Sequence, residues 1–133
     1  MGLDNLIYEE IDCNDGCCKS MQPIKDAKVT ALTRSLCGGI LTDDSYSFRG
    51  KVYDDLVHQY SGLSLYDSDD WTDDDYFKLM TNMFVDKTYG KGVHRNRYGH
   101  QIQPKEQLTL RKLIAYIYEL RNSGRKVEIG AWY

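Results

Sequence analysis

Residues 104–124, with the sequence PKEQLTLRKLIAYIYELRNSG, decide the fold class more than any other stretch of the chain. Pro104 suits the first turn of a helix, where its missing N–H needs no partner. The apolar residues that follow recur at three- and four-residue spacing, which places them on one side of a helix. These residues are Leu110, Leu113, Ile114, Ile117 and Leu120. Gly124 then provides a stop. We expect this segment to be the central helix of the core.

Two further helices are predicted upstream by the same spacing. The first lies between Phe48 and Gly62, with apolar positions at Val52, Leu56, Val57 and Tyr60. The second begins at Thr72, whose hydroxyl can cap the first turn, and the acids at 73–75 suit the positive end of the helix dipole. Its expected buried face consists of Tyr76, Leu79, Met80, Met83 and Phe84.

Strands are predicted at both ends of the chain. Leu3 to Ile11 is a short β-like run that ends at the turn signal Asn14-Asp15-Gly16. Residues 126–133 alternate as a strand does and can pair with the first strand. Residues 24–36 fit neither period, so helix and strand both stay open there. The sequence therefore predicts an α+β fold in a single domain, 1–133, with about three helices packed on a small, mainly antiparallel sheet formed with the terminal strands.

Composition restricts the class of protein. Hydrophobic residues make up 41% of the chain, which also holds 11 Tyr and 2 Trp, so we expect a folded protein. The opening residues 1–5 carry an acid where a signal peptide needs basic residues, and no apolar run approaches about 20 residues. These features predict a cytoplasmic protein without a membrane partner.

The net charge of −3 conceals an uneven distribution along the chain. Residues 1–86 hold 7 basic and 17 acidic side chains, a sum of −10, whereas residues 87–133 hold 10 basic and 3 acidic, a sum of +7. Such an asymmetry indicates a nucleic acid, phosphate or acidic partner, or else attraction between the two parts within the fold. The sequence leaves both interpretations open.

The basic, glycine-containing segment 87–100 is the strongest candidate for a ligand site. Glycines let a backbone approach a ligand, basic side chains donate to phosphate, and tyrosines stack on bases. The predicted phosphate-binding residues are Lys91, His94, Arg95, Arg97, Tyr98 and His100. The segment lacks the Walker pattern G-x-x-x-x-G-K-[ST]. The alternative interpretation is a solvated loop whose charges answer the acidic helix.

The acidic segment 67–75 is a second candidate surface. It fails as an EF-hand, because Trp71, Thr72 and Lys78 stand where calcium binding needs an oxygen ligand, Gly and Glu. It can instead imitate nucleic-acid phosphates toward a host protein, or simply supply the negative charge that a helix N-terminus favours. The predicted partner-binding residues are Asp69, Asp70, Asp73, Asp74 and Asp75.

The sequence gives little support to metal binding or catalysis. Four thiols could bind zinc, but their C-x3-C-C spacing is poor for one ion, so we predict no cofactor and read them as free thiols. These weak metal candidates are Cys13, Cys17, Cys18 and Cys37. His94 and His100 lack a recognisable catalytic motif around them, so the protein is expected not to be an enzyme. A small nuclease or phosphodiesterase remains an alternative to the two binding hypotheses given below.

The strings at residues 1–8, 37–41 and 47–53 resemble those of small uncharacterised proteins of tailed bacteriophages, over about the first half of the chain. This resemblance implies a viral accessory protein, located in the host cytoplasm, that binds and inhibits host machinery such as an anti-phage defence component. The first functional hypothesis is therefore a non-enzymatic inhibitor of a host macromolecule. The alternative is a nucleotide- or nucleic-acid-binding module that uses segment 87–100. A homo-oligomer is compatible with either.

Overall fold

A computed structural model describes residues 4–12, 19–24, 26–34, 36, 47–49, 52–95 and 101–132. The described elements are β1 (Asp4–Asp12), β2 (Lys19–Pro23), α1 (Ala27–Arg34), β3 (Ser47–Arg49), α2 (Val52–Ser61), the 3-10 helix η1 (Leu65–Asp70), α3 (Asp73–Val85), β4 (His94–Arg95), β5 (Gln101–Ile102), α4 (Pro104–Asn122) and β6 (Lys126–Trp132). The α+β class predicted from the sequence is confirmed.

The main sheet is built around β1, and every pairing in it is antiparallel. β2 pairs with the second half of β1 and β3 with its start, while β6 pairs along the other edge from Asp4 to Glu10. Ile7 stands opposite Ile129, and both side chains are buried. The predicted pairing of the two terminal strands is therefore confirmed.

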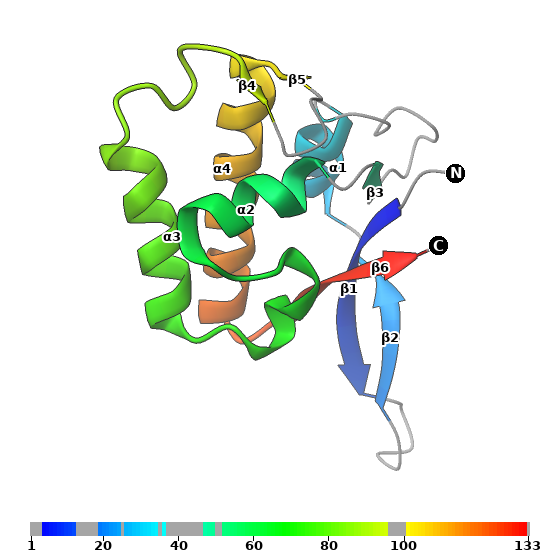
Figure 1. The fold of residues 1–133 in the computed structure, drawn as a ribbon. Coiled ribbons are helices and arrows are strands. Elements are labelled where there is room, and N and C mark those ends of the chain that lie inside the picture. The colour runs from blue at the N-terminus through cyan, green and yellow to red at the C-terminus, as the bar shows by residue number, and fades with distance from the viewer. Residues whose placement is uncertain are drawn as a thin grey trace.

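The helices α2, α3 and α4 gather on one side of the molecule, and β1, β2 and β6 lie on the other (Figure 1). The buried apolar residues of helices and sheet form one cluster. α4 contributes its whole predicted stripe, namely Leu110, Leu113, Ile114, Ile117 and Leu120. α4 is thus the central helix, as its periodicity predicts.

The undecided segment 24–36 contains the short helix α1. An Asp26 carboxylate oxygen accepts hydrogen bonds from the N–H groups of Lys28, at 2.9 Å, and Val29, at 3.1 Å. These bonds satisfy N–H groups that have no partner within the helix. A helix of eight residues has too few turns to show a clear periodicity in the sequence. The hydrogen bonds to Asp26 stabilise its first turn.

α3 has the predicted start but a narrower buried face than predicted. Thr72 and Asp75 form a reciprocal capping box. Three of the expected positions, Tyr76, Leu79 and Met83, are buried, and Met80 is half-buried. The prediction for Phe84 was wrong, because its side chain is 77% exposed. Phe84 lies seven residues from the exposed Phe77, so both occupy the outer side of the helix.

Candidate functional site

Residues 86–93 join α3 to β4, which pairs antiparallel with β5, and we call this connection together with β4, from Asp86 to Arg95, the tethered loop. The fully buried side chain of Gln107, on α4, holds its shape. Gln107 Oε1 accepts from the N–H of Gly90 at 2.7 Å, and Nε2 donates to the carbonyls of Gly92, at 2.7 Å, and Ile102, at 2.9 Å. One neutral side chain thus joins the loop, the hairpin and the first turns of α4.

The loop also packs closely on α4 through its own residues. The buried Tyr89 hydroxyl donates to the Gln107 carbonyl at 2.5 Å, and the Arg111 guanidinium lies 5.7 Å from the Tyr89 ring centroid. Gly90 has a φ of +78°, and a Cβ atom added there would lie 2.5 Å from Cδ2 of Leu108. Glycine is therefore favoured by backbone conformation and by close approach.

A second set of side chains ties the loop to α2. The Tyr60 hydroxyl donates to the Asp86 carboxylate, which also accepts from the Thr88 N–H at 2.9 Å and the Thr88 hydroxyl at 2.7 Å. His94 Nε2 lies 3.2 Å from the Tyr60 oxygen. Because the phenol proton is already directed to Asp86, Nε2 is the donor in this contact. The result is a hydrogen-bonded chain from His94 through Tyr60 to Asp86.

The electrostatics of this chain favour holding the loop over catalysis. Burial and the hydrogen bond to Asp86 raise the pKa of the Tyr60 phenol, which therefore keeps its proton at neutral pH. The hydrogen bonds from Tyr60 and Thr88 lower the pKa of Asp86 to about 2. Because the pKa of the phenol is raised and that of the carboxylate is lowered, transfer of the phenol proton to Asp86 is unfavourable, and Tyr60 is not activated as a nucleophile. The three side chains act as a structural clamp.

Exposed basic side chains surround the tethered loop. Lys91 and Arg95 project from the loop itself. On α4, Lys105 and Lys112 lie three residues before and four residues after Leu108, the residue that faces Gly90. This spacing places them on the same side of the helix as the loop contact. We define the cationic patch as the exposed Lys91, Arg95, Lys105 and Lys112 together with the half-buried Arg111, whose guanidinium lies over the Tyr89 ring.

The sequence predicts a ligand site on segment 87–100. The structure describes residues 87–95 of this segment, and they form a loop with a defined shape. Lys91 and Arg95 are exposed, whereas the His94 ring turns toward Tyr60. Arg97, Tyr98 and His100 lie outside the described residues. Gln107 was missed by the sequence analysis, although it occupies a core-facing position three residues before Leu110. A polar residue at such a position signals a buried hydrogen-bonding role.

The predicted acidic residues lie at the opposite end of α3. Asp70, Asp73 and Asp74 are exposed, and the Asp75 carboxylate accepts from the Thr72 N–H at 2.9 Å. The backbone of Asp69 belongs to η1, and its side chain is outside the described part. The 13 residues of α3 span about 20 Å, well beyond the roughly 8 Å Debye length. Close pairing of these acids with the loop cations is therefore excluded.

Comparison with known proteins gives no relative for this chain. No protein-family model, curated protein or solved structure matches it. The phage resemblance therefore stays a prediction, and function is inferred from the geometry of the described residues.

Metal and membrane sites find no support in the part of the chain that the structure describes. Among those residues, no three His, Cys, Asp or Glu side chains cluster as metal ligands would. The four cysteines and the Asn14-Asp15-Gly16 turn lie outside the described ranges. None of the described helices has the length and apolar character needed to span a bilayer.

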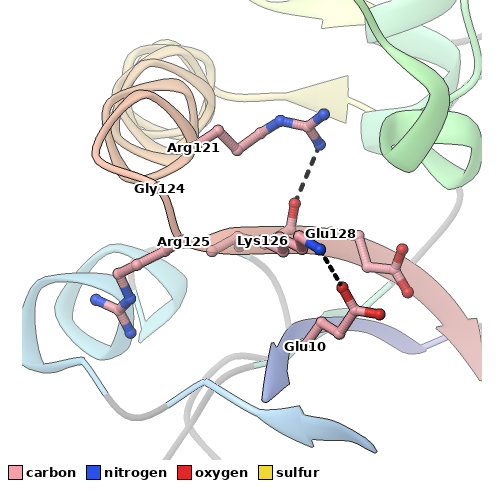
Figure 2. Close-up of a pocket in the computed structure, with 7 residues that line it drawn as sticks. Glu10, Arg121, Gly124, Arg125, Lys126 and Glu128 are labelled. Carbon is pink, nitrogen blue, oxygen red and sulfur yellow. Dashed lines mark hydrogen bonds and ion pairs between the residues drawn. The ribbon is translucent and has the colours of Figure 1, made fainter. Parts of the chain in front are cut away.

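A separate pocket of about 540 Å³ opens where α4 leads into β6 (Figure 2). Its lining residues are Glu10, Arg121, Gly124, Arg125, Lys126, Val127 and Glu128. Arg121 donates to the carbonyls of Val127, at 3.2 Å, and Ser68, at 3.0 Å, and Lys126 pairs with Glu10 at 3.2 Å. Arg125 points away from the Lys126–Glu10 pair (Figure 2). These cations bind other parts of the fold, so the pocket is a weaker ligand site than the patch.

Proposed function

We propose that this chain is a non-catalytic binding protein whose ligand is a host nucleic acid, held at the cationic patch. The supporting observation is the set of three hydrogen bonds made by the buried Gln107 side chain, which hold the loop that carries Lys91 and Arg95. A loop held in one shape before binding loses less conformational entropy when a ligand arrives. The fixed loop therefore favours a binding role over a merely solvated one.

The dimensions of the patch suit the backbone of a single strand. Lys105 and Lys112 are seven residues apart on α4, which corresponds to about 10 Å along the helix axis. Phosphates of one strand lie about 3.4 Å apart along the axis of a double helix and farther apart in an extended single strand, so the two lysines can contact different phosphates. Lys91 and Arg95 add two cations beside this row. Lysine and arginine contacts to phosphate provide affinity without reading sequence, so we expect broad sequence tolerance.

Catalysis is disfavoured by the state of the candidate acid–base groups. The Tyr60 proton is held by Asp86, and His94 donates to Tyr60 rather than facing the surface patch. A general base must be within hydrogen-bond reach of the proton that it removes from a substrate. Holding the loop is the role that these contacts support.

The test is a salt titration of binding to fluorescently labelled single-stranded oligonucleotides, followed by anisotropy. We expect the double variant Lys91→Ala/Arg95→Ala to bind about 10-fold more weakly and its salt slope to fall by about 1.4, the loss expected for two phosphate contacts. Lys78→Ala, which removes an exposed lysine of α3, is the matched control and should change neither quantity. Equal affinity and slope for the double variant and wild type would rule out this ligand site.

A host protein bound by the acidic end of α3 is the second candidate function. It is favoured by the exposure of Asp70 and Asp73 at the end of α3 opposite the tethered loop, since the length of α3, about 20 Å, separates the two ends. In a pull-down from bacterial lysate, Asp70→Lys/Asp73→Lys should lose the captured protein and Lys91→Ala/Arg95→Ala should retain it. Identical capture by both variants would remove the acidic end from consideration.

A further inference from the structure

Arg111 differs from the two arginines near the end of α4, because its guanidinium does not hold another part of the fold. Arg121 donates to backbone carbonyls, and Arg125 makes a double hydrogen bond to Glu9. The contact of Arg111 is a cation–π contact, with Cζ 5.7 Å from the Tyr89 ring centroid. In the described part of the chain, the Arg111 guanidinium makes no ion pair and no hydrogen bond. Its five N–H donors are therefore available to a ligand.

The local sequence explains why no carboxylate neutralises this charge. Side chains three or four residues apart meet on the surface of a helix. The residues at these distances from Arg111 are Gln107, Leu108, Ile114 and Ala115, none of which is acidic. The charge of Arg111 thus stays unpaired on α4.

The ring that Arg111 contacts is itself held in place. Tyr89 is only 4% exposed, and its hydroxyl donates to the Gln107 carbonyl at 2.5 Å. The Tyr60 ring packs edge-on against the Tyr89 ring, with their centroids 5.3 Å apart. Attraction between a guanidinium and an aromatic ring restricts where the guanidinium can lie. Tyr89 therefore holds Arg111 in position before a ligand arrives.

Arginine and lysine recognise phosphate in different ways. A lysine ammonium is a point charge on a flexible chain, whereas a planar guanidinium can donate two parallel hydrogen bonds to two oxygens of one phosphate. Within the cationic patch, Arg111 is half-buried and the other four side chains are exposed. An internal phosphate of a nucleic-acid strand has two non-bridging oxygens, which match the two parallel donors of a guanidinium that is already in position.

We infer that Arg111 is the anchoring residue of the cationic patch and binds one phosphate of the strand through both non-bridging oxygens. Tyr89 holds the guanidinium for this contact. The four exposed cations add charge next to neighbouring phosphates. The inference rests on the proposed function for the identity of the strand, whereas the contact between Arg111 and phosphate can be tested by itself.

Exchange of Arg111 for lysine tests the geometry of the contact at constant charge. In anisotropy titrations with single-stranded oligonucleotides, Arg111→Lys should bind about 10-fold more weakly than wild type with the same salt slope, because only the paired donors are lost. Arg111→Ala should bind more weakly still, and its slope should fall by about 0.7, the value for one phosphate contact. Lys112→Arg, the reverse exchange at the adjacent exposed position, is the matched control and should bind within about twofold of wild type.

NMR spectra of the arginine side chains follow the contact directly. The Nε–H signal of Arg111, assigned by its absence in Arg111→Lys, should shift when inorganic phosphate is added and when an oligonucleotide is added. Sodium chloride at the same ionic strength should leave this signal nearly unchanged. The Arg125 signal is the internal control and should respond to neither anion, because Glu9 already binds its guanidinium.

Two outcomes would overturn the inference. They are oligonucleotide affinity in Arg111→Lys equal to that of wild type, and an Arg111 signal that responds to chloride as strongly as to phosphate. Failure of the proposed function would look different, because the Arg111 signal would then respond to inorganic phosphate in a protein that binds no oligonucleotide. The variants should fold like wild type, since Arg111 makes no hydrogen bond within the described part of the chain.

Discussion

The two ends of α4 use cationic side chains in opposite ways. At the C-terminal end, Arg121 binds backbone carbonyls, and Arg125 makes a double hydrogen bond to Glu9, at 2.6 and 2.8 Å. At the N-terminal end the neutral Gln107 holds the tethered loop, and Lys91 is exposed. Because a neutral side chain shapes this loop, the exposed Lys91 is not needed to hold it, whereas Arg121 and Arg125 are engaged in holding the fold together.

Of the substitutions that test this comparison, replacement of Gln107 should have the largest effect on stability and binding. Gln107→Leu leaves the Gly90 N–H and the Gly92 and Ile102 carbonyls without their partner. At about 1 kcal/mol for each lost bond, we expect the free energy of unfolding in urea to fall by about 2–4 kcal/mol, together with weaker oligonucleotide binding.

The control is Gln101→Leu, which changes an exposed glutamine on β5. It should leave stability within about 0.5 kcal/mol of wild type. If Gln107→Leu were equally stable and bound oligonucleotides equally well, the loop would not depend on its buried tether.

Replacement of one cation at each end of α4 separates the two roles. Arg125→Ala removes the pair with Glu9, so the free energy of unfolding should fall by about 1–2 kcal/mol while oligonucleotide affinity stays unchanged. Lys91→Ala should show the reverse, with unchanged stability and weaker binding. Urea denaturation and anisotropy measured on both variants provide the check. If folded Arg125→Ala lost oligonucleotide binding, the ligand would lie at the C-terminal end of α4 and not at the tethered loop.

A substitution of Gly90 examines how tightly the loop conformation is set. Gly90→Ala should cost about 1 kcal/mol, because alanine disfavours the observed φ of +78°. The contact with Leu108 adds to this cost, because the added Cβ would lie 2.5 Å from Cδ2 and 3.0 Å from Cγ of that side chain, which must shift. Gly92→Ala is the control, because an added Cβ meets nothing within 4 Å. Equal destabilisation by both alanines in thermal denaturation would contradict the proposed loop geometry.

The pH dependence of the clamp should give the smallest effect, because Asp86 is partly exposed and water screens it. Its lowered pKa means that its stabilising contribution is complete above the ordinary value of about 4 and is lost as pH falls through about 2. The Thr88 amide resonance should follow this transition in NMR spectra recorded from about pH 5 to about pH 1. The transition should disappear in Asp86→Asn, and a midpoint near about 4 in wild type would show that the clamp is absent.

Sequence periodicity was enough to predict the elements that bury a complete stripe. The α4 stripe from Leu110 to Leu120 and the strand at 126–132 follow from the period of the apolar residues, because each period shows which side chains are buried. The pairing of that strand with β1 was a separate expectation, which the structure confirms. The role of Thr72 as the N-terminal cap of α3 was likewise predicted from its position before three acids. These features are local or involve the two strongest patterns in the chain.

The features that sequence analysis missed depend on contacts between distant residues. Tyr60 meets Asp86 across 26 positions, and Gln107 meets Gly90 across 17, and neither spacing leaves a periodic signal. Phe84 was assigned to the core because α3 alone does not reveal how narrow its packed face is. The composition of the basic segment indicated a ligand site. The side chain that holds this segment is the neutral Gln107, which lies on α4.

The most direct test of the central claim is a two-dimensional NMR titration of the labelled protein with a single-stranded oligonucleotide at low salt. The account predicts chemical-shift changes that concentrate in residues 87–95 and 105–112 and weaken as salt is added. Residues 121–128, where the cations hold the fold, should stay nearly unchanged. Shifts centred on 121–128, or no shifts at all, would contradict the assignment of ligand binding to the tethered loop.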